Sequence, residues 1–454
     1  MALIKSISGI RGTIGNSIGN NLTPVDIVEC VAGFGSWIIK SGFNKKVVVG
    51  RDGRISGKMV SELAIQTLIA LGIDVIDLGL STTPTVEVIV PKEKAGAGII
   101  FTASHNPKEW NALKFLNNKG EFISAQDGKD IIALIDSKAI NFAEIDHLGT
   151  ISKYNNAIDE HIDLILGLPY VDKNLIRSKN FHVVVDCINS TGAISIPPLL
   201  DKLGVKYTLI NEEVNGNFAH NPEPLPKHLS ELSETVIKLE ADLGISIDPD
   251  VDRLAFVNED GSMFGEEYTL VAVADYILSI KSGNSVSNLS STRALGDITK
   301  KRGGSYFASA VGEVNVVNAM KEHKAVIGGE GNGGIILPEL HYGRDALVGI
   351  AIFLTHLAKS EVTMSALRSE YPDYQMVKDK VSIEGLDINK ILEEIIINNK
   401  GGKVSTIDGV KIDYDNGWVH IRKSNTEEVI RIYSEANTIE NAREYIQNVK
   451  KVVN

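Results

Sequence analysis

The chain has 454 residues, of which 43% are hydrophobic and 23% charged, values that are ordinary for a globular protein. Its 46 basic and 58 acidic residues give a formal net charge of −12, which argues against the clustered positive charge that nucleic-acid binding needs. An acidic chain can still bind a small anionic substrate in a locally basic cleft. At roughly 150 residues per domain, the length predicts about three domains, with room for four smaller ones.

The N-terminal segment MALIKSISGIRG has no apolar core, so we expect no signal peptide. The two cysteines, Cys30 and Cys187, each stand in an apolar stretch, which favours buried free thiols over a disulfide. The most apolar long run, residues 347–358, contains polar residues and is too short to span a bilayer, so it predicts a buried helix. We therefore expect a cytoplasmic protein with no membrane partner.

One pattern recurs along the chain: a short β-branched run ends in a polar turn, and a helix-like segment follows. It occurs at residues 46–54, before a helix expected near 58–71, and again at 183–192, 245–250 and 325–334. Strands, loops and helices in series are typical of α/β domains, and fully apolar strands favour mostly parallel sheets. Ligands bind beyond the carboxyl ends of such strands, which is where these polar turns lie.

The character of the sequence changes near residues 369–375. Short alternating runs follow at 404–407, 410–414 and 418–421, with Asp-Gly and Asn-Gly turns between them. Such turns between alternating runs are a strong local signal for β-hairpins. The sequence therefore predicts several similar α/β units in series, followed by a small α+β domain.

Residues 102–107, the Ser104 loop, read Thr-Ala-Ser-His-Asn-Pro after a strand-like run. A serine at the end of a strand can act as a nucleophile if a neighbouring group activates it. The alternative is an ordinary turn, because Ser, Asn and Pro all favour turns and the serine elbow of α/β-hydrolases is absent. His105 need not face Ser104, so a role in structuring the loop is its simpler interpretation.

Residues 248–253, the aspartate loop, read Asp-Pro-Asp-Val-Asp-Arg. Carboxylates at alternate positions are a hard oxygen-ligand set suited to Mg2+, provided that the chain bends to bring them together, which Pro249 favours. A solvated acidic turn is the plain alternative. An EF-hand loop is disfavoured, because Arg253 stands where that loop requires glycine.

Residues 328–334, the glycine loop, read Gly-Gly-Glu-Gly-Asn-Gly-Gly and contain the spacing G-x-G-x-x-G of dinucleotide-binding loops. That fingerprint must open a helix, whereas here Pro338 stops any helix soon after the loop. We favour a loop whose glycines let a sugar approach closely, with Glu330 accepting hydrogen bonds from hydroxyl groups.

Residues 422–427, the arginine loop, read Arg-Lys-Ser-Asn-Thr-Glu, and Arg431 follows nearby. Two cations, two hydroxyls and an amide match the donors that hold a phosphate dianion, although an ordinary charged turn has the same composition. Arg11 and Lys114 are cations in similar Gly- or Asn-containing settings. Each of these two, taken alone, is typical of surface charge.

Together and in their order along the chain, the four loops resemble those of the α-D-phosphohexomutase family, which includes phosphoglucomutase, phosphomannomutase and phosphoglucosamine mutase. The resemblance covers essentially the whole chain, and four motifs in order are far more specific than one. It implies an α/β fold of four domains around a central cleft, the first three alike. The expected phosphoserine, metal-binding, sugar-binding and C-terminal α+β phosphate-binding domains are residues 1–152, 153–256, 257–370 and 371–454.

The resemblance also implies an isomerase that moves a phosphoryl group between O6 and O1 of a hexose phosphate. Ser104 would carry the phosphate, a sugar 1,6-bisphosphate would be the intermediate and activator, and Mg2+ would bind the phosphoserine and the aspartates Asp248, Asp250 and Asp252. Arg11 and Lys114 match family residues near the phosphoserine, Lys114 is the candidate for proton transfer, and His105 completes the catalytic candidates. The expected substrate-binding residues are Arg253, Glu330, Asn332, Arg422, Ser424, Asn425, Thr426 and Arg431.

The sequence departs from the family pattern at several positions. The family's sugar loop often ends in His, whereas this chain has Gly334, and Lys423 stands where Pro is common. The aspartate loop carries Pro249 and Val251 where Gly or Ala is usual. None of these changes removes a charged group from the chemistry, but the first leaves the hexose open.

The form of the glycine loop resembles phosphoglucosamine mutases most, whereas Asn425 leans toward the glucose and mannose enzymes. We therefore expect conversion of glucosamine 6-phosphate to glucosamine 1-phosphate, with phosphoglucomutase or phosphomannomutase activity as the alternative. A dinucleotide-dependent oxidoreductase and a non-catalytic sugar-phosphate binding protein are more distant, and the intact Ser104 and aspartates argue against the latter. We expect a monomer or homodimer.

Overall fold

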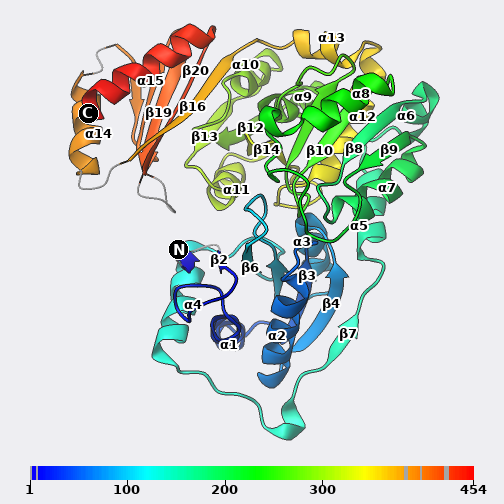
Figure 1. The fold of residues 1–454 in the computed structure, drawn as a ribbon, viewed down its shortest axis with the longest axis vertical. Helices are drawn as coiled ribbons and strands as arrows, with labels where there is room; N and C mark the ends of the chain where they lie inside the picture. Colours follow the sequence, from blue (N-terminus) through cyan, green and yellow to red (C-terminus); the bar gives the residue numbers. More distant parts are fainter. Residues whose placement is uncertain (1–2, 7–8, 383–386, 399–400, 424–428, 454) are drawn as a thin grey trace.

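The structure, a computed structural model, describes residues 3–6, 9–382, 387–398, 401–423 and 429–453. Within these residues the chain forms four sheets, each from a consecutive stretch of sequence (Figure 1). We call each sheet with its helices a unit and number the units in chain order.

The first unit contains a seven-stranded sheet and four α-helices. Its strands are β1 (Ile4–Ser6), β2 (Gly9–Thr13), β3 (Lys46–Arg51), β4 (Asp74–Leu80), β5 (Ala97–Phe101), β6 (Trp110–Leu116) and β7 (Ile151–Lys153). They lie in the order β1-β2-β6-β5-β3-β4-β7. Its helices are α1 (Pro24–Lys40), α2 (Gly57–Ala70), α3 (Thr83–Lys92) and α4 (Ala125–Ser137), with the short 3-10 helix η1 (Ile145–His147).

The second unit contains a four-stranded sheet. Its strands are β8 (His182–Asp186), β9 (Lys206–Ile210), β10 (Leu243–Ile247) and β11 (Leu254–Asn258), in the order β11-β10-β8-β9. Its helices are α5 (Ala157–Leu166), α6 (Lys173–Lys179), α7 (Gly192–Leu203) and α8 (Ser230–Lys238), with the 3-10 helix η2 (Pro226–His228).

The third unit repeats this plan. Its strands are β12 (Asn284–Asn288), β13 (Tyr306–Ser309), β14 (Ala325–Glu330) and β15 (Gly334–Ile336), in the order β13-β12-β14-β15. Its helices are α9 (Glu266–Ile280), α10 (Ala294–Lys301), α11 (Glu313–Glu322), α12 (Ala346–Ser360) and α13 (Met364–Ser369).

The three units share one four-strand arrangement, in the orders β4-β3-β5-β6, β9-β8-β10-β11 and β13-β12-β14-β15. In each, the first three strands are parallel and the fourth returns antiparallel to the third. This confirms the expected three similar mixed α/β domains. The repeat also means that the turn between the third and fourth strands lies at the same place in every unit.

Helix starts in this protein follow from local sequence. Thr23 and Asp26 form a capping box around the first turn of α1, with Pro24 at the first helical position. Asp345 caps α12 by accepting from the backbone amides of Leu347 and Val348. The helix expected at residues 347–358 is thus confirmed as α12, and it is buried. Among the residues that the structure describes, no helix is long and apolar enough to cross a bilayer.

The hydrophobic cores show how the units are joined. One continuous core extends from Ile162 to Tyr371, so the second and third units share it. The first unit has its own core, which includes Phe34 and Phe115 with their rings stacked at a 4.2 Å centroid distance. Cys30 and Cys187 are buried and free, as predicted.

The fourth unit is antiparallel throughout and has a separate core. Its strands are β16 (Gln375–Ser382), β17 (Lys403–Ser405), β18 (Val410–Tyr414), β19 (Gly417–Lys423) and β20 (Val429–Ala436), in the order β16-β20-β19-β18-β17. Its helices are α14 (Ile388–Asn398) and α15 (Ile439–Val453). The two predicted hairpins, β17–β18 and β18–β19, are confirmed. This unit lies at the upper left of Figure 1, beside the third unit.

Candidate active site

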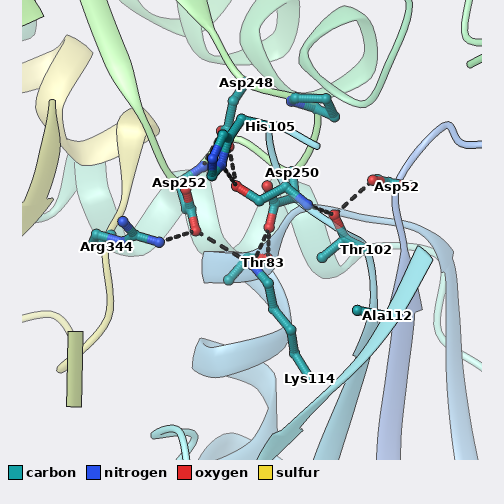
Figure 2. Close-up of polar contacts among 12 residues, drawn as sticks. Asp52, Thr83, Thr102, His105, Ala112, Lys114, Asp248, Asp250, Asp252 and Arg344 are labelled. Carbon is teal, nitrogen blue, oxygen red and sulfur yellow. Dashed lines mark hydrogen bonds and ion pairs between the residues drawn. The ribbon is translucent and has the colours of Figure 1, made fainter. Parts of the chain in front are cut away.

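Three of the four loops identified in the sequence occupy the same position in the three repeated units. The Ser104 loop joins β5 to β6, the aspartate loop joins β10 to β11, and the glycine loop joins β14 to β15. Each therefore follows the third strand and leads into the antiparallel fourth strand of its unit. Figure 2 shows residues of the first two loops, with Lys114 and Arg344, converging on one point.

Ser104 is held against the aspartate loop. Its Oγ donates to Oδ2 of Asp248 at 2.7 Å, and its backbone N–H donates to Oγ1 of Thr102 at 2.9 Å. The residue is 7% exposed and has φ of 50°. A non-glycine residue adopts this left-handed backbone rarely, and such strain concentrates at functional sites. The serine hydroxyl is therefore fixed at a carboxylate by both its backbone and its side chain.

A buried arginine, Arg54, holds the Ser104 loop in place. Its guanidinium donates at 2.6–2.9 Å to the carbonyl oxygens of Ser104, Asn106, Pro107 and Trp110. Its Nε lies 3.0 Å from Oδ2 of Asp52, which also accepts from Oγ1 of Thr102. Burial raises the pKa of Asp52, and the charge of Arg54 opposes that rise. Every N–H group of this guanidinium thus donates to a carbonyl oxygen of the loop segment or to Asp52.

The three aspartates of the aspartate loop converge. An oxygen atom of each lies within 4.8 Å of the others, and all three side chains are buried. In a flat strand they would be too far apart for one ion. Val251, between Asp250 and Asp252, has φ of 62°, an outlier for a β-branched residue, and this bends the loop. Its carbonyl oxygen accepts from the amide of Ala346 at the start of α12.

The residues present fit a divalent cation. Among the described residues, Oδ1 of Asp250 and Oδ1 of Asp252 are buried without a hydrogen-bond partner. Burial, followed by repulsion from Asp252 and Asp250, holds the pKa of Asp248 well above its usual range. Buried, unpaired carboxylate oxygens are costly unless a cation or proton neutralises them. The acidic cluster is therefore a candidate metal site built from hard oxygen ligands.

Lys114 is the cation nearest to these carboxylates. It extends from β6, with its Nζ 2.7 Å from Oδ2 of Asp250 and 3.6 Å from Oδ2 of Asp252. Oγ1 of Thr83 donates to the same Asp250 oxygen at 2.6 Å. Burial disfavours the charge on Lys114, but the two carboxylates outweigh that effect and raise the pKa of Lys114. Lys114 is therefore protonated in this arrangement.

Arg344 connects the aspartate loop to the glycine loop. Its guanidinium donates to Asp252, Glu313 and Glu330 at 2.7, 3.0 and 2.8 Å. The absence of a side chain at residue 334 makes room for it, because a Cβ there would lie 2.3 Å from Cδ of Arg344. Gly334, the departure from the family pattern, therefore has a packing reason in this chain.

The side-chain oxygens of Glu330 and Asn332 in the glycine loop already accept hydrogen bonds. Glu330 accepts on Oε1 from Asn288 and from the amide of Gly312, and on Oε2 from Arg344. Oδ1 of Asn332 accepts from the backbone amide of Gly334 at 3.1 Å. The amide oxygen of Asn332 therefore closes the loop's own turn, whereas its side-chain NH2 has no hydrogen-bond partner among the described residues and is the end that remains for a ligand.

Two further candidates lie beside the cluster. Nδ1 of His105 lies 3.3 Å from Oγ of Ser104, and burial, with Arg253 next, holds the pKa of the imidazole well below its usual range. The ring is therefore neutral. Arg253 donates to Glu223 at 3.1 Å, and its Nε lies 4.0 Å from Oδ2 of Asp248. The structure thus brings both residues to the serine and the aspartates.

The remaining candidate cations from the sequence, Arg11, Arg422 and Arg431, lie outside this cluster. Arg11 lies on β2, where its backbone pairs with Ala112 of β6, and burial lowers the pKa of its guanidinium. Among the described residues its side chain has no hydrogen bond or ion pair with the cluster. Arg422 and Arg431 lie opposite each other on β19 and β20, so both side chains extend from one face of the fourth sheet. Three expected phosphate ligands, Ser424, Asn425 and Thr426, lie outside the described residues.

Family models match nearly the whole chain in four consecutive segments. Residues 3–141, 159–261 and 265–374 match the phosphoglucomutase/phosphomannomutase alpha/beta/alpha domains I, II and III, and residues 376–452 match the C-terminal domain. The chain belongs to the phosphoglucomutase/phosphomannomutase family. Its curated relatives are mutases, which are isomerases, and this phosphohexomutase is an enzyme of that class.

Two relatives and one solved structure illustrate the likeness. A phosphoglucomutase/phosphomannomutase of Thermococcus kodakarensis is 36% identical, over 97% of this chain and 96% of the relative. A phosphoglucosamine/phosphogalactosamine mutase of Sulfurisphaera tokodaii is 31% identical, over 100% of this chain and 99% of the relative. The crystal structure of a family protein from Burkholderia thailandensis has a TM-score of 0.86 and 25% identity, covering 99% of this chain and 97% of that one.

Sequence reasoning missed the two arginines that organise this phosphohexomutase. Arg54 stands in the polar turn after β3, and that position at a strand's carboxyl end was the signal that could have singled it out. Arg344 had no such signal, because its three carboxylate partners come from distant parts of the chain. The structure argues against a dinucleotide site, because the glycine loop leads into strand β15, whereas the dinucleotide-binding fingerprint requires a helix there.

Proposed function

We propose that this phosphohexomutase moves a phosphoryl group between O6 and O1 of glucosamine phosphate, with Ser104 as the phosphate carrier. The observation that supports it best is the contact between Ser104 Oγ and Asp248, 2.7 Å, beside two further buried aspartates and Lys114. A strained serine facing a cluster of hard oxygen ligands is what metal-assisted phosphoryl transfer needs.

The three aspartates would hold one Mg2+, whose positive charge would stabilise the transferring phosphoryl group. The chain's own residues then have distinct tasks. Arg54 fixes the carbonyl groups of the Ser104 loop, so the serine oxygen keeps its position during transfer. The low exposure of Ser104 limits the access of water, which would otherwise hydrolyse a phosphoserine.

In the first half of the proposed reaction, the bond between phosphorus and Ser104 Oγ breaks as a bond to the sugar hydroxyl oxygen forms; that hydroxyl loses its proton, and Ser104 Oγ, as the leaving group, takes one up. In the second half, Ser104 Oγ forms a bond to the other phosphorus of the bisphosphate intermediate and loses its proton, and the sugar oxygen that the phosphate leaves takes up a proton. Lys114, protonated and paired with Asp250, suits that donation. Arg11, on the strand next to β6, would contribute positive charge near the phosphoserine.

The phosphate that is not being transferred would bind to the fourth unit. Arg422 and Arg431 lie opposite each other, so two guanidinium groups extend from the same face of the sheet. Nε of Arg422 is buried without a hydrogen-bond partner among the described residues. A phosphate dianion would pair with such a guanidinium in a bidentate manner.

The identity of the hexose is the most specific element of the proposed function. Glu330 would accept from hydroxyl groups common to all the hexoses, so discrimination would arise at C2, near Asn332. One observation favours a second candidate, glucose or mannose phosphate. Oδ1 of Asn332 is bound to Gly334, and the free NH2 group pairs better with a hydroxyl oxygen than with an ammonium group. The form of the glycine loop favours the amino sugar and this orientation of Asn332 opposes it, so we expect only a modest preference for the amino sugar, on the order of tenfold.

The phosphate-carrier role is tested with Ser104→Ala. We expect the wild-type enzyme to carry a fraction with about 80 Da of additional mass, one phosphoryl unit, and the variant to carry none. Turnover of hexose phosphate should fall to background, because the group that accepts and returns the phosphate is gone. Circular dichroism should show an unchanged fold. Near-normal turnover in the variant would refute the mechanism.

The sugar preference is tested by competition among glucosamine 6-phosphate, glucose 1-phosphate and mannose 1-phosphate, with relative kcat/KM as the measurement. A preference for glucosamine phosphate supports the first assignment. A tenfold or greater preference for either neutral sugar assigns the second candidate, in agreement with the orientation of Asn332.

A further inference from the structure

A second cluster of metal-ligand side chains lies at the junction of the first three units. His161 comes from α5, whereas His341 and Asp345 come from the segment between β15 and α12. Nε2 of His161 lies 3.0 Å from Oδ2 of Asp345, and Nε2 of His341 lies 3.3 Å from the same oxygen. The side chains of His161 and Asp345 are fully buried, and that of His341 is 8% exposed. The two imidazoles thus converge on one carboxylate oxygen.

The outer atoms of the two rings face the first unit. Nδ1 of His161 lies 3.1 Å from Oγ1 of Thr85, and Nδ1 of His341 lies 3.3 Å from Oε2 of Glu87. The Glu87 side chain is fully buried, yet neither of its oxygens has a hydrogen-bond partner among the described residues. It fits only because residue 343 is glycine, where a Cβ would lie 1.8 Å from Oε2 of Glu87. A buried carboxylate in this condition requires a proton or a positive charge beside it, and His341 is the residue placed to receive or supply that charge.

We propose that His161, His341 and Asp345 bind one transition-metal ion of the Zn2+ class, separate from the aspartate loop. Imidazole nitrogens suit Zn2+ and Co2+, whereas Mg2+ prefers oxygen ligands. A tetrahedral ion with ligands at about 2.0–2.1 Å holds them about 3.3 Å apart, close to the two separations seen here. Three protein ligands leave a fourth position for water.

The surroundings match those of protein metal sites. A metal-ligating histidine usually donates its other ring N–H to a carboxylate or another oxygen, as Glu87 and Thr85 allow here. Oδ1 of Asp345 accepts from two backbone amides at the start of α12, so Oδ2 is the oxygen available to an ion. Metal ligation requires neutral imidazoles, so the ligated site, with Asp345 and Glu87, would carry a charge of −2 that one divalent ion neutralises. Without the ion, burial opposes a charge on His341, but Asp345 and Glu87 outweigh it and raise the pKa of His341 to about 10, so a proton then takes the place of the ion.

This ion would brace the supports of the catalytic loops. Thr83, two residues before Thr85 on α3, donates to Asp250. Arg344, the residue before Asp345, donates to Asp252. The ion would therefore tie together α3, α5 and the start of α12, which come from the first, second and third units. Its expected effect is on the stability of this junction, and it would take no part in phosphoryl transfer.

The first experiment uses the full chain without an affinity tag, stripped of metal and then kept in millimolar Mg2+ to occupy the aspartate loop. On titration with Co2+, we expect one equivalent to bind with the visible d–d absorption of a four-coordinate site. Under the same conditions, Zn2+ should displace the Co2+ and raise the Tm by several degrees, since it binds the folded state alone. Absence of the absorption band in the folded wild-type protein would overturn the proposal.

The second experiment separates metal binding from hydrogen bonding. His161→Gln and His341→Gln keep an N–H donor for Asp345 but replace an imidazole ligand by a poor one, so each should weaken Co2+ binding at least tenfold. His356→Gln is the matched control, because His356 is a largely buried histidine on α12 whose ring bonds to Tyr371 at 2.9 Å. Asp250→Asn should leave the band unchanged. Equal Co2+ binding in wild type and in the two cluster variants would refute the site.

Discussion

The three catalytic loops are connected to the rest of the molecule differently from the arginine face, which is the face of the fourth sheet that carries Arg422 and Arg431. The Ser104, aspartate and glycine loops are joined directly across units by buried charged groups, among them Arg344 and Lys114. The second and third units also share one hydrophobic core. The fourth unit has its own core and meets the third through polar contacts, such as Ser290 with His420 and Arg293 with Glu435.

This difference corresponds to two separate tasks in the proposed reaction, phosphoryl transfer at the joined loops and phosphate binding at the arginine face. Phosphoryl transfer depends on the alignment of reacting atoms, and small displacements there cost large factors in rate. Holding the far phosphate contributes mainly to binding, which both the ground and transition states share. We therefore expect changes in the joined loops to reduce kcat strongly, and changes on the arginine face to act more on KM.

The largest effect is expected at the aspartate loop. Chelation should silence the wild-type enzyme and Mg2+ should restore it, because three buried carboxylates otherwise repel one another. Asp250→Asn should reduce kcat by roughly a hundredfold or more, since it removes one anionic ligand. The measurement is kcat as a function of Mg2+ concentration.

The control for this experiment is Asp130→Asn, which changes an exposed aspartate on α4 whose carboxylate accepts from the side chain of Gln126 at 2.9 Å. It should behave as wild type. Activity that persists in excess chelator would contradict this prediction, because it would mean that the joined loops work without a metal ion.

An intermediate effect is expected at Arg344. Arg344→Lys keeps the positive charge, but one ammonium group cannot bridge Asp252, Glu313 and Glu330 together. Breaking a buried ionic network of this kind costs about 3–5 kcal/mol, so both Tm and kcat should fall. Arg302→Lys, at a partly exposed ion pair with Asp275, is the control. If Tm falls while kcat is retained, Arg344 has only a structural role.

The smallest effect is expected on the arginine face. Arg422→Lys loses the planar fork that binds phosphate in a bidentate manner but keeps the charge. KM for the hexose phosphate should rise about tenfold, equivalent to about 1.4 kcal/mol, with a smaller fall in kcat. Steady-state kinetics on both parameters decide this. A fall confined to kcat would contradict this prediction and would mean that the fourth unit, like the joined loops, acts on phosphoryl transfer.

Much of the fold was predictable because its signals are local. The strand, turn and helix series follows from β-branched runs and capping residues, as at Thr23 and α1. The hairpins of the fourth unit follow from Asp-Gly and Asn-Gly turns. The position of the Ser104, aspartate and glycine loops at strand ends was predictable for the same reason, since a polar turn after an apolar strand is visible in the sequence.

The contacts between loops were decided by tertiary structure alone. The bend at Val251, which makes the aspartates converge, is a conformation that β-branched residues avoid, so no local preference predicts it. In the sequence, Arg54 and Arg344 cannot be told apart from ordinary charged residues. Their roles follow only from the carbonyl and carboxylate oxygens that the fold places around them. The sequence by itself determined which residue types stand after which strands. Only packing among the three units determined which of those residues meet, because the energy of a buried charge depends on partners that are distant in the chain.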